Sequence, residues 1–286
     1  ACLWWRKAAA RPCRNMTAEG AARMLDYDFM RTAFLAALLV ALVCGPVGWF
    51  LVLRGQTFGS HALSHVGFAG ATGALMLGLS PLTGLAGGAL TAGVLMGLAG
   101  DRVAGRDVMI GLVLSVAMGV GALFLHLLTR SASAATALLF GDILGISPGM
   151  LGWLALLSAG CLLGLGIMAR PLLFATLQPE MAEAKGVPLQ LLDVLFLALV
   201  AIATAECAQI TGVLLVFTLM VAPAATVLRL GLSPLAGLGA AAGLALAEAW
   251  GGLILSWYTD CPTSFWIALL GGAGFLLVGL VQRFRA

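Results

Sequence analysis

Two of the three histidines in this 286-residue chain stand four positions apart, within Gly59-Ser-His-Ala-Leu-Ser-His-Val66. On a helix, residues at i and i+4 lie on one face, as two imidazole ligands of a single metal ion would. Imidazole suits zinc and other late first-row metals. The alternative is a polar packing motif, in which Ser64 and both histidines bond to neighbouring helices. The spacing predicts either a metal site at His61 and His65 or a polar helix contact.

Four carboxylates lie in or beside the apolar runs and are further candidates, namely Asp142, Glu206, Glu248 and Asp260. Ionisable groups within membrane spans are costly and mark functional positions by default. Carboxylates and imidazoles together suit hard or borderline divalent cations, so the four join the histidines as a candidate ion pathway. Asp142 and Asp260 also stand beside turn-forming residues, where helix capping is the commoner role of a carboxylate. For Glu248, a pathway-lining role and a buried interhelical bond both remain open.

The composition places these residues in a membrane protein. Hydrophobic residues make up 62% of the chain and charged residues 9%, with a mean hydropathy of +1.08. A soluble domain has about a quarter charged residues, so this chain lacks the polar surface to cover a globule in water. The 38 glycines allow membrane helices to approach closely. So few charges give no support to a nucleic-acid partner, and membrane lipid is the expected surrounding.

Several chemistries are excluded by missing motifs. The chain has only two lysines, Lys7 and Lys185, and neither lies in a phosphate-binding G-x-x-x-x-G-K-[ST] loop. It has no H-E-x-x-H zinc-protease helix and no G-x-S-x-G elbow. Its six cysteines contain no C-x-x-C pair, so neither a zinc cluster nor a disulfide framework is indicated. Ser64 and His65 would point about 100° apart on a helix, which weakens an intramembrane hydrolase. We therefore expect no enzyme and no cofactor bound by this chain.

A membrane helix needs about 20 mostly apolar residues, and the sequence predicts eight to ten such spans, with nine favoured. Between the fourth and fifth, Ala134–Ser147 is apolar but short and predicts a re-entrant piece buried in protein. The nine are Thr32–Leu53, His61–Leu79, Leu82–Ala99, Val108–Leu128, Met150–Ala169, Leu189–Ala205, Ile210–Leu230, Leu235–Trp257 and Phe265–Val281. Residues 24–286 form one all-α transmembrane domain in this interpretation. Residues 1–23 are a compositionally different tail, with Met16 and Met24 as candidate start residues.

Basic residues in short loops mark the cytoplasmic side of a membrane protein. With alternating spans, one face collects Arg54, Arg102, Arg106, Arg170, Lys185, Arg229, Arg283 and Arg285. Arg130 is the exception. Nine spans then leave the N-terminus outside, which the basic residues before Arg31 argue against. The internal loops predict that the face with Arg54 is cytoplasmic.

A compact polar island, Thr176–Pro188, separates two long apolar runs on this face and holds Glu180, Glu183 and Lys185. Such an island is expected to lie in water and to touch a soluble partner. Pro223 falls inside a predicted span, where proline removes a helix hydrogen bond and produces a kink. Small residues flank it, so it is either a hinge or an ordinary membrane-helix proline.

Several blocks of sequence resemble the membrane permease of metal-type ABC importers, the family that takes up zinc, manganese or iron. They are spread in order from about residue 24 to the C-terminus. They are Arg54-Gly-Gln-Thr-Phe, Ala62-Leu-Ser-His-Val-Gly-Phe-Ala-Gly70, Phe140-Gly-Asp-Ile-Leu-Gly-Ile-Ser147, Pro179-Glu-Met-Ala-Glu-Ala-Lys-Gly186, Gly212-Val-Leu-Leu-Val, Ala222-Pro-Ala-Ala-Thr226 and Ser256-Trp-Tyr-Thr-Asp-Cys-Pro-Thr263.

The resemblance implies a homodimeric helical bundle of the type II importer kind in a bacterial cytoplasmic membrane. It implies two cytoplasmic ABC ATPase subunits, which hydrolyse the ATP, and an extracytoplasmic metal-binding protein. It also implies that a coupling helix lies in Pro179, Glu180, Met181, Ala182, Glu183, Ala184, Lys185 and Gly186. Family members often carry an aspartate just before the A-L-S-H block, where this chain has Ser60-His61; this change favours zinc over manganese. A secondary, ion-coupled transporter with Glu206 and Glu248 as relay carboxylates is the alternative.

Overall fold

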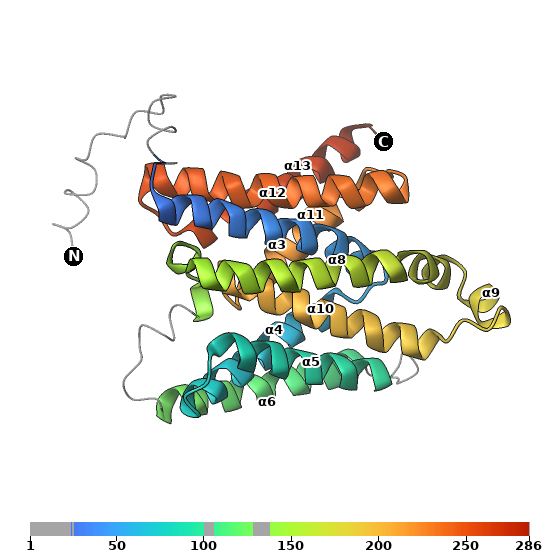
Figure 1. The fold of residues 1–286 in the computed structure, drawn as a ribbon. Coiled ribbons are helices and arrows are strands. Elements are labelled where there is room, and N and C mark those ends of the chain that lie inside the picture. The colour runs from blue at the N-terminus through green and yellow to red at the C-terminus, as the bar shows by residue number, and fades with distance from the viewer. Residues whose placement is uncertain (1–23, 25, 100–105, 128–137, 286) are drawn as a thin grey trace.

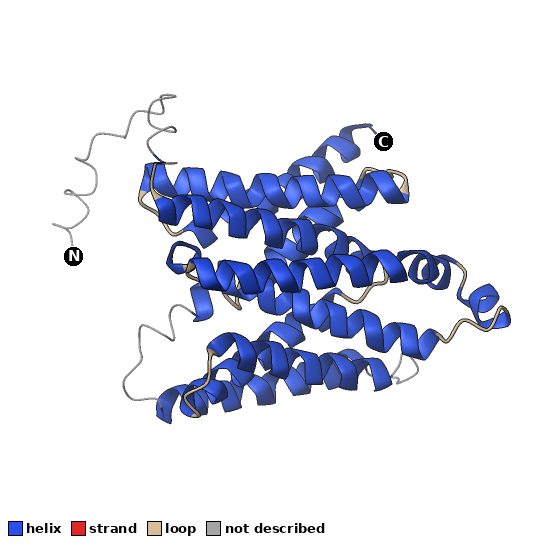
Figure 2. Cartoon of the chain, in the orientation of Figure 1, coloured by secondary structure: helices blue, strands red, loops and turns tan. Residues whose placement is uncertain are grey.

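The computed structural model describes residue 24 and residues 26–99, 106–127 and 138–285, and within these ranges the fold contains helices and no strands (Figures 1 and 2). The predicted tail 1–23, Arg102 and Arg130 lie outside the described residues. The elements are α3 (Asp28–Leu53), α4 (Thr57–Met76), α5 (Pro81–Ala99), α6 (Arg106–Leu127), the 3-10 helix η1 (Ile143–Gly145), α8 (Pro148–Leu177), α9 (Pro179–Ala184), α10 (Leu189–Thr211), α11 (Val216–Arg229), α12 (Pro234–Thr259) and α13 (Thr263–Arg285).

Seven helices of the described part are long and apolar enough to cross a membrane, namely α3, α5, α6, α8, α10, α12 and α13. This confirms an all-helical, multi-pass protein but not the favoured count of nine. The span predicted over His61–Leu79 corresponds to α4, whose hydropathy is lowered by Thr57, Ser60, Ser64 and the two histidines. The span predicted over Met150–Ala169 is longer, because α8 runs through Pro171 to Leu177.

The prediction of one span over Ile210–Leu230 is wrong. Helix α10 continues to Thr211, the chain turns at Gly212, and α11 has only 14 residues. Gly212 has φ of 77°, a conformation that glycine adopts without steric cost. Its neighbour across the turn is Gly141, and a Cβ on either would overlap the backbone of the other segment. The close contact of two glycines thus places the break after Thr211, six residues beyond the predicted end of the span at Ala205 and inside the next predicted span.

The described part of the predicted re-entrant segment packs on this same turn. Val213 N donates to Leu138 O at 3.1 Å, and Leu214 N donates to Leu139 O at 3.4 Å. Ile143 and Ile146 are buried. The backbone is therefore bonded to protein, as non-helical chain within a membrane protein requires. Residues 134–137 of the prediction lie outside the described part.

Helix α3 lies at the centre of one group of helices and packs against α8, α10, α11 and α12. Glycines permit the close approach: Gly45 abuts Ala242 of α12, and Gly48 abuts the backbone of Met220 in α11. Helices α4, α5 and α6 form a second group, joined to the first mainly through the contact of α5 with α10 (Figure 1). Without a hydrophobic drive between helices in lipid, such small-residue contacts supply the packing.

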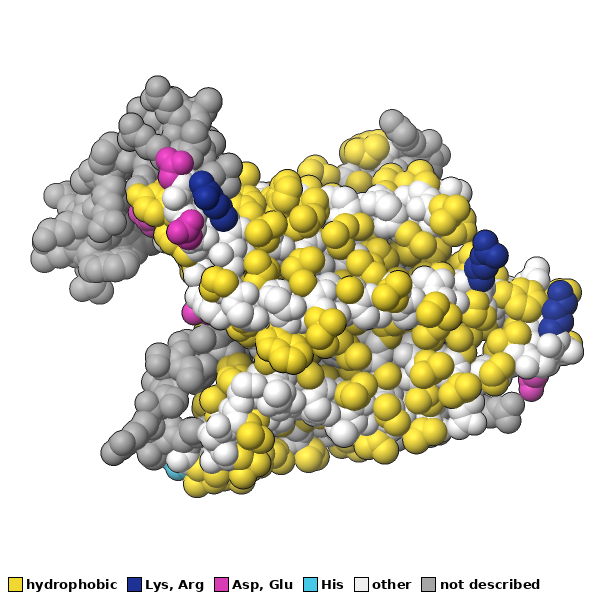
Figure 3. Space-filling model, viewed as in Figure 1, with side chains coloured by type: hydrophobic (Ala, Val, Ile, Leu, Met, Phe, Trp, Pro, Cys, Tyr) yellow, Lys and Arg dark blue, Asp and Glu magenta, His cyan; other side chains and the backbone are white. Residues whose placement is uncertain are grey.

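The long helices run roughly parallel to one another, and α9 projects beyond their ends on the side where the C-terminus lies (Figure 1). Hydrophobic side chains dominate the face drawn in Figure 3, and the charged side chains on it are gathered toward the two ends. This is the surface expected of a bundle whose middle lies in lipid and whose ends lie in water. Arg54 and Lys185 directly follow α3 and α9, whose ends lie on the same side of the bundle in Figure 1.

Candidate ion pathway and coupling element

His61 and His65 lie next to each other on α4. Their ring centroids are 4.7 Å apart and the rings are nearly perpendicular. His65 is 5% exposed, and its Nδ1 has no hydrogen-bond partner among the described residues. A buried polar atom without a partner costs free energy unless it has another use, and a lone pair directed at a cation is such a use.

The histidine pair has a polar neighbour within α4 and a ring contact with a neighbouring helix. Ser64 Oγ donates to the carbonyl of His61 at 2.7 Å, a bond within α4 and not to a neighbouring helix. The ring of His61 packs against Phe217 of α11, with centroids 5.7 Å apart. This ring contact links the histidine pair to the helix that contains Pro223.

Glu206 lies on the face of α10 toward α8 and is fully buried. Ser158 of α8 donates to Glu206 Oε2 at 3.1 Å, whereas Oε1 has no hydrogen-bond partner in the described part. The three buried cysteines, Cys44, Cys161 and Cys207, carry free thiols. Glu206 is thus a half-satisfied buried carboxyl in the core of the first helix group.

Glu248 lies on α12 and is 4% exposed. Neither of its carboxyl oxygens has a hydrogen-bond partner among the described residues. Gly271 of α13 and Thr218 of α11 lie beside it, since a Cβ built on Gly271 would be 3.1 Å from both Glu248 Oε2 and Thr218 Cγ2. The alternative of a buried interhelical bond finds no bond in these ranges. Glu248 therefore stands as an unpaired polar group among three helices.

Asp142 and Asp260 face the same pocket of about 500 Å³, at the end opposite α9. The pocket lies between the start of α3, the η1 segment, the end of α12 and the start of α13. Asp142 also caps η1, because Gly145 N donates to its Oδ1 at 3.0 Å. Asp260 ends α12 in the left-handed conformation, with φ of 55°. Tertiary structure brings these two residues to the lining of one pocket although they are 118 positions apart in the sequence.

The six candidates therefore occupy four places: the histidine pair, Glu206, Glu248 and the pocket lined by Asp142 and Asp260. In the ranges that the structure describes, no three His, Cys, Asp or Glu side chains are close enough to hold one metal ion. In this conformation the six predicted pathway residues therefore lie in four separate places and do not form a single closed site in the described part.

The predicted coupling element is the helix α9, set between α8 and α10. Ala182 is its one buried residue, while Glu180, Met181, Glu183, Ala184 and Lys185 are exposed. Met181 is 53% exposed at its tip, and the ammonium of Lys185 lies 5.4 Å from the ring centroid of Phe174 in α8. Helix α9 thus offers an apolar tip surrounded by charges, outside the helix bundle.

The predicted hinge, Pro223, lies in the middle of α11 and is buried. Its neighbour Ala222 lies beside Gly271 of α13, so two small residues meet next to Pro223. At the end of α11, the guanidinium of Arg229 lies 3.8 Å above the ring of Phe275 in α13, and Gln282 Nε2 donates to Arg229 O. The end of α11, six residues after Pro223, therefore contacts α13.

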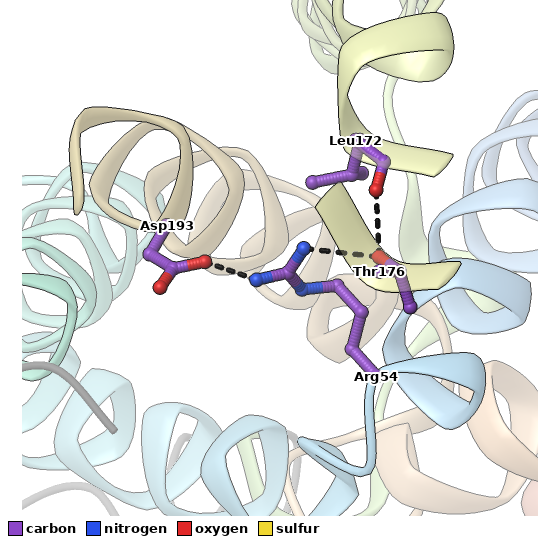
Figure 4. Close-up of polar contacts among 4 residues, drawn as sticks. All are labelled: Arg54, Leu172, Thr176 and Asp193. Carbon is purple, nitrogen blue, oxygen red and sulfur yellow. Dashed lines mark hydrogen bonds and ion pairs between the residues drawn. The ribbon is translucent and has the colours of Figure 1, made fainter. Parts of the chain in front are cut away.

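Sequence reasoning missed an ion pair at the end of α3. Arg54 contacts Asp193 of α10 through Nη2, and its Nη1 donates to Thr176 Oγ1 of α8 at 3.1 Å (Figure 4). Asp193 lies inside the predicted span Leu189–Ala205. The rule that identified Glu206, that ionisable groups inside spans are functional or paired, would have identified Asp193 as well.

Comparison with known proteins places the chain. Residues 26–282 match the model of the ABC 3 transport family. The chain belongs to the ABC 3 transport family. This family match confirms the resemblance found in the sequence blocks. The permeases of the family are transport subunits and not enzymes. With seven apolar spans in its described part, the chain is a multi-pass metal-transport permease of the bacterial cytoplasmic membrane.

Three similar proteins illustrate the family. The manganese transport system membrane protein MntC of Halalkalibacterium halodurans is 31% identical over 71% of this chain and 70% of its own length. A protein of Treponema pallidum named "Probable metal transport system membrane protein" is 32% identical over 92% of this chain and 99% of its length. The structure of PsaBC from Streptococcus pneumoniae, in complex with Fab, matches with a TM-score of 0.82 at 24% identity, over 90% of this chain and 95% of that one; it shows that the fold is shared.

Proposed function

We propose that this ABC 3 permease moves a divalent first-row metal ion inward, with His61 and His65 as its central ligands. The proposal is carried by the histidine pair, whose rings lie 4.7 Å apart on α4 with one buried nitrogen unpaired in the described part. Two imidazoles suit zinc better than manganese. The one relative named above for manganese, MntC of Halalkalibacterium halodurans, keeps that ion as the direct competitor.

The buried carboxyls of Glu206 and Glu248, and the pocket lined by Asp142 and Asp260, complete the proposed path; we call this pocket the outer pocket. Asp142 and Asp260 receive the ion at the outer pocket, and Glu206 and Glu248 offer it oxygen ligands deeper in the bundle. Each of the four places holds few ligands. Few ligands suit transport, because a site with four ideal ligands would bind the ion and not release it. We propose that these groups of ligands approach one another only in another conformation of the permease.

In this proposal, partner proteins supply the free energy for transport. In this proposal an extracytoplasmic metal-binding protein delivers the ion, two copies of the chain form the channel, and two ABC ATPase subunits bind and hydrolyse ATP. ATPase closure displaces α9, from Pro179 to Gly186, and the helices reorient with Pro223 as the hinge. The exposed Met181 and its surrounding charges support a docking role for α9.

Uptake of radiolabelled zinc, manganese and iron into proteoliposomes tests the proposal. The chain is reconstituted with its ATPase and metal-binding protein, and each ion is supplied alone and in competition. We expect ATP-dependent uptake, with zinc preferred, and its loss in His65→Ala. Uptake that continues without the ATPase would favour the secondary transporter with Glu206 and Glu248 as relays.

A second experiment tests the coupling element by replacing Glu183 and Lys185 with glutamine. The control replaces Gln190, which lies beyond the element on α10 and donates to Leu98 O. We expect the first variant alone to lose stimulation of the ATPase by the loaded metal-binding protein. Unchanged stimulation and uptake would contradict a coupling role for α9.

A further inference from the structure

The guanidinium of Arg54 binds two helices at once. Nη2 forms the ion pair with Asp193 on α10, Nη1 donates to Thr176 Oγ1 on α8 at 3.1 Å, and the group lies 5.5 Å from the ring centroid of Phe196 (Figure 4). The side chain of Arg54 is 10% exposed and that of Asp193 16%. An ion pair this well shielded keeps its geometry better than a surface pair, which salt screens.

The two partners of Arg54 lie on either side of the coupling element. Thr176 precedes Pro179 by three residues at the end of α8, and Asp193 follows Gly186 by seven residues at the start of α10. A displacement of α9 therefore reaches both flanks, and both flanks are bonded to the same guanidinium.

Arg54 is itself joined to the helix that carries the histidines. It caps the end of α3, and only Gly55 and Gln56 separate it from the start of α4. Gly55 N donates to Val52 O and Gln56 N donates to Leu51 O, each at 3.0 Å. These two bonds, with Gly55 at φ of 67°, form the Schellman turn that closes a helix. The turn fixes Arg54 against the first residues of α4.

We propose that Arg54 is a positioning residue that transmits the displacement of α9 to α4 and so to His61 and His65. This inference rests on the proposed function and names the connection that the coupling needs. A planar guanidinium suits the task, since it offers two donors in a fixed fork, whereas an ammonium is a point charge on a flexible stem. Arg54→Lys can keep the ion pair but not both contacts in fixed geometry.

The experiment measures ATP hydrolysis and ion uptake in the same proteoliposomes, with the complete importer and the metal-binding protein loaded with zinc. Thr176→Val removes the hydroxyl at nearly constant volume, and Thr176→Ser keeps it. Thr91→Val is the matched control, because Thr91, like Thr176, bonds the carbonyl four residues earlier, but on an exposed face of α5. Arg31→Gln is the control for loss of an arginine at the opposite end.

We expect Thr176→Val and Arg54→Lys to lower the number of ions moved per ATP by about tenfold, the loss of one hydrogen bond to a charged group. ATPase activity without metal stays within about twofold in the same variants, and Thr176→Ser and both controls keep the wild-type ratio. A merely structural role would lower uptake and hydrolysis together through loss of assembled protein, and would not change the ratio.

An unchanged ratio in Thr176→Val and Arg54→Lys overturns the inference and leaves the proposed function standing. If Arg54→Lys does not assemble, the comparison of Thr176→Val with Thr176→Ser still decides. A wild-type importer that hydrolyses ATP but moves none of the three metals overturns the proposed function and this inference with it.

Discussion

Replacing Glu248 by methionine is expected to stabilise the protein while abolishing transport. Glu248 is 4% exposed, and both of its carboxyl oxygens lack a hydrogen-bond partner in the described ranges. Methionine has a similar length, is flexible and carries no strongly polar atom. It can therefore occupy the space beside Gly271 and Thr218 without burying an unpaired carboxyl.

The magnitude follows from what the carboxyl costs. In proteins, burial of a polar group without a compensating hydrogen bond costs about 1–3 kcal/mol, so Glu248→Met should raise the free energy of unfolding by about that amount. For a chain of this size, 1 kcal/mol corresponds to roughly 2–4 °C in melting temperature. Glu248→Gln keeps buried polar atoms and should change the melting temperature little.

Glu206→Met is the matched comparison. Glu206 is equally buried but accepts a hydrogen bond from Ser158 at 3.1 Å. Its replacement loses that bond, worth about 1 kcal/mol, and leaves the buried hydroxyl of Ser158 behind. The gain should therefore be smaller than for Glu248→Met by about 1 kcal/mol or more.

Thermal unfolding of the purified chain in one detergent, followed by intrinsic tryptophan fluorescence, measures all three variants against the wild type. ATP-driven zinc uptake is then measured on the same preparations. A melting temperature lowered by Glu248→Met, or raised more by Glu206→Met, would refute the reasoning that Glu248 is unpaired. Full zinc uptake by the Glu248→Met variant would show that Glu248 is not part of the ion pathway.

Four other substitutions, one of them a control, have expected outcomes. Gly84→Ala places a Cβ against Gly70 O and should destabilise the α4–α5 contact by roughly 1–3 kcal/mol, as the same melting assay would show. Gly87→Ala on the same helix is the control, because its Cβ meets nothing within 4 Å. It should be neutral or slightly stabilising. Phe217→Ala removes the ring that packs on His61 and should lower zinc uptake severalfold at unchanged folding, as separate measurements of uptake and melting temperature would show; equal uptake would separate α11 from the histidine pair. His61→Asp exchanges an imidazole for a carboxylate and should shift preference from zinc toward manganese, read as the ratio of the two ions taken up in competition.

Some features of this protein could be predicted from particular residues. The i, i+4 spacing of His61 and His65 placed both rings on one helix face, and their rings do meet. The polar residues from Pro179 to Lys185 predicted a water-exposed element between two spans, and α9 projects from the bundle (Figure 1). Both features are local, so periodicity and polarity suffice to find them.

Other features needed contacts between distant segments. The end of α10 at Gly212 depends on its contact with Gly141, which hydropathy does not report. The apolar character of residues 210–230 predicts one span, and only the backbone contact shows the break.

The sequence by itself determined that this chain is a membrane bundle, which face carries the basic residues, and where the histidine pair and the coupling element lie along the chain. Only the tertiary structure decided that Arg54 meets Asp193 across 139 positions, that Glu206 has a partner in Ser158 and that Glu248 has none in the described part. The physical reason is that hydropathy and helical periodicity act over a few turns, whereas the partner of a buried charge is set by which helices pack side by side.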